Sequence, residues 1–262
     1  KTWKILLVIS GCFAVIAASG AAYYTIVTQD AVLDEKKLVI SDDKIEIFDA
    51  NGRAVKDAAA FSPKETFRLD SLSEKVKFAF VDTEDKRFYD HDGFDYKRIV
   101  KATWKNLKSR SFKEGASTIS QQLIKNTHLS QEKTIKRKLK EFKLTRQLEK
   151  RYTKDEILEK YLNTIYFGHN CFGLSSAAEF YFGKEPSELR LAEAAVLAGL
   201  IKSPNNYSPF KHPENCLGRK KTVLSAMLAQ GHITEEEKED ALSVPLPTAP
   251  SAGALDKSYF DR

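Results

Sequence analysis

The sequence is poor in cysteine. Its 262 residues include three Cys, of which Cys12 lies in an apolar run, and no C-x-x-C pair occurs. This scarcity excludes a disulfide scaffold and gives no support to a zinc site. Cys171 and Cys216 could form one bridge, or both could be small buried hydrophobic residues. The chain also lacks a G-x-S-x-G, an H-E-x-x-H and a P-loop motif, which removes the common signatures of hydrolases, metalloproteases and nucleotide-binding enzymes.

Charge is missing from the start of the chain. No charged residue falls between Lys4 and Asp30, which leaves 25 uncharged residues, 5–29. A helix of this length spans about 37 Å, enough to cross a hydrocarbon core of about 30 Å. We therefore expect a transmembrane helix, with residues 1–4 in the cytoplasm and the chain after Asp30 outside. A cleavable signal peptide is the alternative, although its apolar region spans only about 7–15 residues.

The rest of the chain predicts a mainly α-helical domain. Residues 30–64 read as an extracytoplasmic connector with a short β-hairpin at Asn51-Gly52, residues 65–245 as the main domain, and residues 246–262 as a linker rich in Pro and Ala. Capping boxes and other boundary signals mark the expected helix ends. These signals are Ser71-x-x-Glu74, Asp95, Ser117, Ser130, Thr153-x-x-Glu156, Pro213 with Gly231, and Thr234-x-x-Glu237.

Glu84 is the first candidate for catalysis. It ends an apolar helical pattern and has Phe80, Val81 and Phe88 nearby. Apolar neighbours disfavour an ionised carboxylate, which suits a general acid or base working near neutral pH. The alternative is a solvated helix end, because acidic residues beside basic ones are common on surfaces.

Two further segments are suited to anion binding. Residues 115–126 (GASTISQQLIKN) form a Ser/Thr-capped helix start whose free amides can bind phosphate or carboxylate, unless it is an ordinary capped helix. In the next helix Lys133, Arg137 and Lys140 share one face with Glu141 beside them, which suits a polyanionic leaving group. A charged outer face or a nucleic-acid stripe would look the same, but the expected location outside the cell counts against nucleic acid.

Glu84 and Glu141 together form a candidate carboxylate pair, the usual equipment of sugar-transfer chemistry. The S-x-x-K sequences at Ser130 and Ser208 match acyl-serine enzymes, but no K-T-G follows them. We therefore expect no transpeptidase site in this chain.

Five ordered motifs resemble the peptidoglycan glycosyltransferase domain (glycosyltransferase family 51) of class A penicillin-binding proteins and of monofunctional transglycosylases. They cover about residues 65–245. The matching residues are Glu84-Asp85-x-x-Phe88-x-x-His91-x-Gly93, Gly115 to Asn126, Arg137-Lys138-x-x-Glu141, Lys154-x-x-Ile157-Leu158-x-x-Tyr161-Leu162-Asn163-x-x-x-Phe167-Gly168, and Arg219-Lys220-x-x-Val223-Leu224-x-x-Met227.

The resemblance implies a lysozyme-like, two-lobed fold, and it implies that the enzyme polymerises lipid II into β-1,4 glycan strands. The anomeric carbon would be inverted and undecaprenyl pyrophosphate released. The implied catalytic residues are Glu84, as general base, and Glu141, directly or through a divalent cation (Mg²⁺ or Mn²⁺). The implied substrate-binding residues are Asp85, Phe88, His91, Gly115, Ser117, Thr118, Gln121, Gln122, Lys125, Asn126, Lys133, Arg137, Lys138, Lys140, Tyr161, Asn163 and Arg219. Of these, Tyr161, Asn163 and Arg219 are expected to support the shape of the site.

The resemblance also implies a single-pass protein of the bacterial cell membrane. Its expected partners are lipid II, the growing glycan chain, the cytoplasmic membrane, moenomycin-type phosphoglycolipid inhibitors and the cell-wall synthesis machinery, without nucleic acid. Residues 246–262 would lead towards a transpeptidase domain. A lysozyme-like glycan hydrolase using the same two carboxylates and a non-catalytic membrane-anchored scaffold are the competing interpretations.

Overall fold

The computed structural model describes residues 2–39, 66–109, 117–130 and 132–251. These residues are mainly helical, and their only β-pairing is an isolated bridge between Tyr166 and Phe172. The predicted hairpin at Asn51-Gly52 lies outside them. The α-helices are α1 (Thr2–Thr28), α2 (Glu74–Glu84), α3 (Tyr96–Ser109), α4 (Ile119–His128), α5 (Ile135–Arg151), α6 (Lys154–Thr164), α7 (Leu174–Phe182), α8 (Leu191–Leu200), α9 (Pro213–Gln230) and α10 (Glu235–Ser243).

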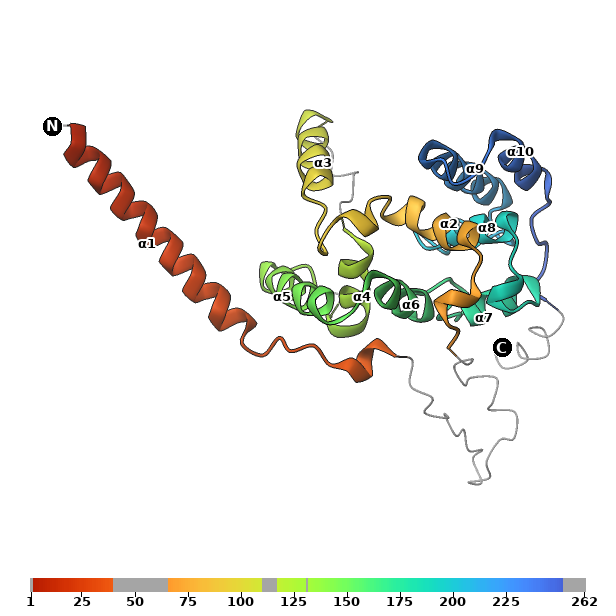
Figure 1. Cartoon of the computed structure of the whole chain (residues 1–262), viewed down its shortest axis with the longest axis horizontal. Coiled ribbons are helices and arrows are strands. Elements are labelled where there is room, and N and C mark those ends of the chain that lie inside the picture. Colours follow the sequence, from red (N-terminus) through yellow and green to blue (C-terminus); the bar gives the residue numbers. More distant parts are fainter. Residues whose placement is uncertain (1, 40–65, 110–116, 131, 252–262) are drawn as a thin grey trace, which may run out of the picture.

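Helix α1 extends away from the other helices as a long arm (Figure 1). Near its C-terminal end Tyr24 packs edge-to-face on Phe142 of α5, with ring centroids 6.5 Å apart. The uncharged run, apart from Gln29, thus lies within one continuous helix, although a transmembrane helix was expected. None of the helices in the described part of the chain combines the length and hydropathy of a membrane span.

The core is built around α8, which packs against α2, α7, α9 and α10. Seven consecutive residues of this helix, 194–200, are buried, as expected for a helix that is apolar on all sides. A second group, in which α4 packs against α5 and α6, adjoins it. Phe80 of α2 and Phe167 belong to the same core, with their rings in edge-to-face contact at 6.3 Å.

Most helix boundaries follow the sequence signals. Thr153 and Thr234 form the predicted capping boxes of α6 and α10. Helix α9 begins at Pro213 and ends at Gln230, and the capping residue after it is Gly231, whose φ of 79° suits glycine. Three predicted caps are wrong by a few residues. The caps in the structure are Ser73 rather than Ser71, Thr118 rather than Ser117, and Thr134 rather than Ser130.

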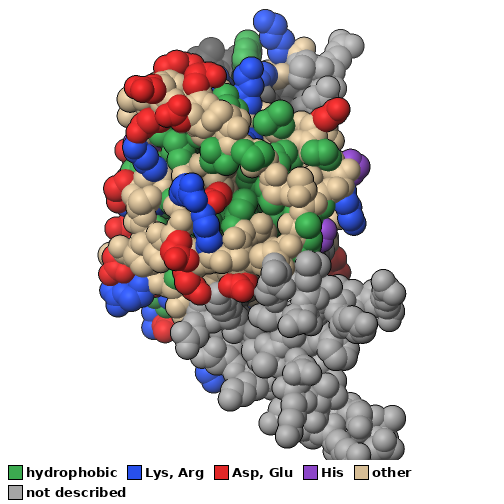
Figure 2. All heavy atoms as spheres, turned by 90° about the vertical axis from the view of Figure 1, so that its right-hand side faces the viewer, with side chains coloured by type: hydrophobic (Ala, Val, Ile, Leu, Met, Phe, Trp, Pro, Cys, Tyr) green, Lys and Arg blue, Asp and Glu red, His purple; other side chains and the backbone are tan. Residues whose placement is uncertain are grey.

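The end of the molecule opposite α1 faces the viewer in Figure 2, where apolar side chains are exposed between acidic and basic ones. Ser251, in the predicted linker, donates its amide to Phe180 O at 2.9 Å and its hydroxyl to Glu179 O at 2.6 Å. The first part of this linker is therefore docked on α7. Cys171 and Cys216 are both free and buried, which decides against the bridge.

Candidate functional site

The carboxylate of Glu84 lies at the C-terminal end of α2 and is held between two polar groups. Its Oε2 accepts a hydrogen bond from Gln122 Nε2 of α4 at 3.0 Å, and its Oε1 lies 3.9 Å from Arg219 Nη2 of α9. The Glu84 side chain is 14% exposed. The predicted apolar surroundings are therefore only part of its environment, since its two oxygens face an amide and a guanidinium.

Asp85, the next residue, is completely buried and links the end of α2 to the start of α4. Its carboxylate contacts His91 Nε2 at 3.0 Å and accepts the backbone N–H of Ile119, in the first turn of α4, at 3.1 Å. A carboxylate at a helix N-terminus satisfies an unpaired amide and interacts favourably with the helix dipole. Thr118 adds a second link by donating its hydroxyl to Gly93 O at 2.7 Å. The first and second motifs are thus joined directly.

Glu141, the second predicted carboxylate, is buried in α5 with its side chain 2% exposed. It accepts a hydrogen bond from Gln121 Nε2 at 2.9 Å, pairs with Lys138, and lies 3.9 Å from Arg137 Nη1. Gln121 and Gln122 are consecutive residues of α4, and they hold Glu141 and Glu84 respectively. Helix α4 therefore positions both carboxylates, although Glu84 belongs to α2 and Glu141 to α5.

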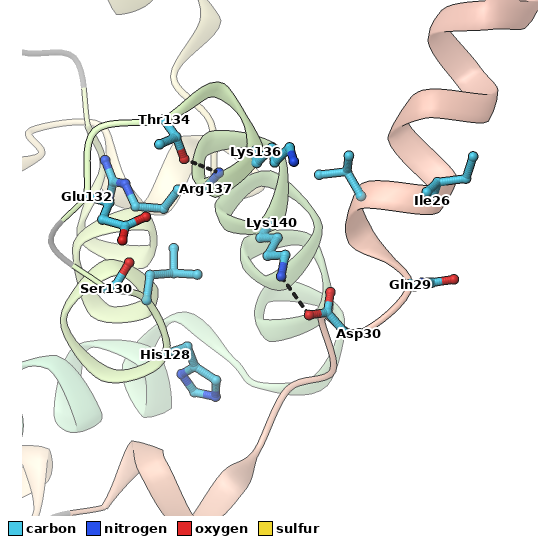
Figure 3. A pocket seen from close by; sticks show the side chains of 12 residues that line it. Ile26, Gln29, Asp30, His128, Ser130, Glu132, Thr134, Lys136, Arg137 and Lys140 are labelled. Carbon is cyan, nitrogen blue, oxygen red and sulfur yellow. Dashed lines mark hydrogen bonds and ion pairs between the residues drawn. The ribbon is translucent and has the colours of Figure 1, made fainter.

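A cavity of about 620 Å³ lies between the C-terminal end of α1 and α5 (Figure 3). Three cations of α5 line it, Lys136, Arg137 and Lys140, and Figure 3 shows Lys136 and Lys140 pointing from α5 towards α1. Lys140 forms an ion pair with Asp30 at 2.6 Å. Val27, Leu129 and Ile26 give part of the wall apolar character, so the cavity suits an anionic group that carries a hydrocarbon chain.

Arg137 is well placed to receive such an anion. Its Nε is one of the buried side-chain donors of the described residues that have no hydrogen-bond partner in the structure. Leaving a buried donor unsatisfied costs about 1–3 kcal/mol, so an acceptor that fills this position gains that amount. His128, on the same wall, has its pKa lowered by burial and hydrogen-bonds to the backbone of Asp34.

Arg98 of α3 belongs to the site although the sequence gave no signal for it. Its Nη1 donates to the backbone carbonyl of Glu84 at 2.6 Å and lies 3.9 Å from Asp85 Oδ1. The start of α3 is fixed by Asp95, which accepts the Arg98 N–H at 2.7 Å and pairs with Arg87. The amide and the arginine hold the pKa of Asp95 below its usual value, against the opposing effect of burial.

Several predicted binding residues are buried and support the site from behind. Phe88 and Tyr161 are fully buried, and Phe88 lies under Lys154 Nζ, 4.6 Å from the ring centroid. Asn163 donates to Phe67 O at 3.0 Å and accepts the Phe67 N–H at 3.2 Å. These contacts are all made within the protein.

Other predicted residues remain accessible. Ser117, Asn126 and Lys133 are exposed and Lys125 is half-buried. Gly115 lies outside the described residues. His91, besides contacting Asp85, lines a second cavity of about 840 Å³ with Phe94 and with charged residues of the segment 87–97 and of α5, among them Arg87 and Arg146.

A dedicated metal centre is not built into the described part of the chain, where no three His, Cys, Asp or Glu side chains come together. Glu141 offers a single carboxylate, already shared with Gln121 and Lys138. Mg²⁺ is often held by one or two carboxylates together with substrate phosphates. Glu141 therefore fits a cation only if the substrate supplies most of the ligands.

The family model described as "Transglycosylase" matches residues 52–228. Penicillin-binding protein 1F of Bacillus subtilis (strain 168) is 41% identical over 207 residues, covering 79% of this chain and 29% of that protein. Penicillin-binding protein 1A/1B of the same organism is 42% identical over 247 residues, covering 93% and 26%. Penicillin-binding protein 1A of Aquifex aeolicus (strain VF5) is 43% identical over 201 residues, covering 77% and 28%.

This chain thus spans between 26% and 29% of the length of these three relatives. Among solved structures, the crystal structure of penicillin-binding protein 1A from Haemophilus influenzae aligns with a TM-score of 0.43 and 24% identity. That alignment covers 78% of this chain and 20% of the other.

Proposed function

This chain belongs to the transglycosylase family, and from that membership and the geometry of its site we propose that it is a peptidoglycan glycosyltransferase that polymerises lipid II. One observation carries the proposal. Adjacent residues of α4, Gln121 and Gln122, hold two carboxylates, and Glu141 in turn contacts Arg137 in the cation-lined cavity. A base and an anion site are thus linked through one short stretch of helix.

In the proposed reaction Glu84 is the general base. It takes the proton from the acceptor 4-hydroxyl, and that oxygen attacks the anomeric carbon of the donor. The bond from this carbon to the pyrophosphate breaks as the new β-1,4 bond forms on the opposite face, so the configuration is inverted. Undecaprenyl pyrophosphate leaves with the bonding electrons. General-base assistance of this kind contributes about 10²–10⁴-fold to a rate.

Cations would stabilise the leaving pyrophosphate. Arg137 and Lys140 line the cavity beside Glu141, and the exposed Lys133 and half-buried Lys125 lie in neighbouring segments. A guanidinium with a free Nε can bind phosphate through more than one donor, which an ammonium cannot do in the same fixed geometry. If Mg²⁺ or Mn²⁺ takes part, Glu141 would supply one carboxylate ligand and the pyrophosphate most of the others, and the ion would neutralise phosphate charge.

The proposal includes attachment to the bacterial cell membrane. Its support is the uncharged run 5–29, followed by a cavity whose walls combine cations with Ile26 and Val27. A polyprenyl pyrophosphate would place its charged group at such a position while its hydrocarbon chain remains in lipid. With the positive-inside rule, the N-terminus would lie in the cytoplasm and the helical domain outside. Moenomycin-type phosphoglycolipids, which also join phosphate to a lipid chain, would compete for this cavity.

A glycan hydrolase with the same carboxylate pair is the second candidate, and the cation-lined cavity argues against it because a neutral glycan has no pyrophosphate to bind. The deciding experiment is incubation of the protein with lipid II in detergent or vesicles, with products separated by gel electrophoresis. We expect new glycan polymer and released undecaprenyl pyrophosphate. Shortening of preformed strands, without new polymer, would contradict the proposal.

A further inference from the structure

Tyr161 of α6 is fully buried, yet its hydroxyl is connected to the proposed base. The hydroxyl donates to Gln122 Oε1 at 3.2 Å, and Gln122 Nε2 donates to Glu84 Oε2 at 3.0 Å. Three residues from α6, α4 and α2 thus form one chain of hydrogen bonds that ends on the reacting carboxylate. No part of Tyr161 is accessible to a substrate, so any effect on the reaction passes through Gln122.

The chain of hydrogen bonds has a fixed direction. A carboxylate only accepts, so the amide must present its NH₂ to Glu84 and its oxygen to the tyrosine. The pKa of Tyr161 is raised well above its ordinary value, first by burial and then by the charges of Glu84 and Asp85. Its hydroxyl therefore keeps its proton and remains a donor. Without this hydroxyl, the amide could rotate and place its oxygen against the carboxylate.

We propose that Tyr161 is a positioning residue, which acts through Gln122 to fix the carboxylate of Glu84 with Oε2 occupied and Oε1 available as the proton acceptor. The inference rests on the proposed function, because it assumes that Glu84 is the base. It gives a specific role, orienting the base, to Gln122, which was expected to bind substrate, and to Tyr161, which was expected to support the shape of the site. Arg219 Nη2 lies 3.9 Å from Oε1, beyond hydrogen-bonding distance, so this guanidinium does not occupy Oε1.

The test compares Tyr161→Phe with Tyr181→Phe. Tyr181 is a matched control, since it is also a buried tyrosine, lies on α7, and donates its hydroxyl to Phe167 O at 2.9 Å without contacting Glu84. Both variants lose one buried hydroxyl, so thermal unfolding should show similar losses of stability. With lipid II, we expect Tyr161→Phe to lower kcat about 10-fold with KM within about 2-fold, while Tyr181→Phe keeps the wild-type kcat.

A pH–rate profile and a double-mutant cycle separate positioning from a merely structural role. If the Gln122 amide rotates in Tyr161→Phe, the ionised carboxylate of Glu84 loses the hydrogen bond from Nε2. The acid limb of the kcat profile of Tyr161→Phe should therefore move to higher pH. Because Tyr161 acts through Gln122, adding Tyr161→Phe to Gln122→Met should cost no further activity. Equal kcat for Tyr161→Phe and wild type, or additive losses in the double variant, would overturn the inference.

A measurement without substrate keeps this inference distinct from the proposed function. In the wild-type protein the side-chain amide signals of Gln122, followed by NMR, should shift with pH as Glu84 titrates, and this response should disappear in Glu84→Gln and change in Tyr161→Phe. Amide signals that do not respond to pH in the wild type would contradict the hydrogen-bonded chain. Absence of polymer from wild-type protein would instead contradict the proposed function.

Discussion

Asp85 Oδ2 accepts the backbone N–H of Ile119 at 3.1 Å, across 34 positions of sequence. The same carboxylate contacts His91, so the residue next to the proposed base ties the end of α2 to the start of α4. The helix that begins there carries Gln121 and Gln122, which hold the two carboxylates. The geometry of the site therefore depends on a contact that no substrate makes.

Asp85→Asn should lower the free energy of unfolding, whereas replacing a residue that only binds substrate would leave it unchanged. The amide keeps one acceptor but loses the charge that faces the α4 amide and His91, and a poorly satisfied buried group costs about 1–3 kcal/mol. Urea unfolding should show this loss. Asp92→Asn, on an exposed residue of the same loop, is the control and should be neutral. Equal stability of the two variants would contradict the structural role.

The lowered pKa of Asp95 predicts that the protein loses stability at acid pH. Its pKa in the folded protein is lowered, so the ionised form stabilises the fold fully above the unfolded pKa of about 3.9, and this contribution is lost as the pH falls through the lower folded value. Wild type should therefore be more stable than Asp95→Asn at pH 7, and the gap should close below about pH 4. Urea unfolding of both proteins at a series of pH values measures this difference in stability. A gap that is the same at pH 3 and pH 7 would refute this account.

Arg137 should matter for the donor more than for folding. Removing its charge with Arg137→Gln takes away the guanidinium of the cavity, and loss of a charged hydrogen bond costs about 1.5–3 kcal/mol, which corresponds to a decrease in kcat/KM of about 10–150-fold. Arg146→Gln provides the matched control, because Arg146 is on the same helix but lines the other cavity. Steady-state rates with lipid II decide the matter, and equal rates for the two variants would show that the cavity is not the pyrophosphate site.

Helix α3 carries an exposed apolar face that suits a bilayer surface. Tyr96, Val100, Trp104 and Leu107 lie three or four residues apart and are each at least 62% exposed. Trp104→Glu should weaken co-sedimentation with anionic vesicles, since an apolar face buried in the headgroup region drives such binding. Thr222→Glu introduces the same charge at an exposed position of α9, away from this face, and should bind more tightly than Trp104→Glu. Identical binding would rule out this face as a contact with lipid.

The sequence predicted the helical class and many helix boundaries because these depend on local chemistry. Thr153 and Thr234 cap the predicted helices, since a capping box involves only residues three positions apart. The boundaries that shifted, such as that of α5 from Ser130 to Thr134, lie where several Ser and Thr compete for the same role. Local patterns identify the candidate cap residues but do not show which of them begins the helix.

The sequence predicted which residues belong to the site, but it did not predict the hydrogen bonds between them. Glu84 and Glu141 were identified, but Arg98 was missed because its bond to the Glu84 carbonyl depends on the path of the chain between α2 and α3. Phe88, in the list of expected substrate-binding residues, is fully buried, and so is Tyr161, which was expected to support the shape of the site. A motif shows that residues act together, and only the fold shows which of them contact one another.

The most direct test of the central claim is lipid II polymerisation by Glu84→Gln, compared with Glu74→Gln at the exposed N-terminal end of the same helix. The glutamine cannot accept the proton, so Glu84→Gln should lose about 10²–10⁴-fold in kcat with unchanged thermal stability, while Glu74→Gln stays active. Wild-type rates of polymerisation by Glu84→Gln, with the protein folded, would show that Glu84 is not the base.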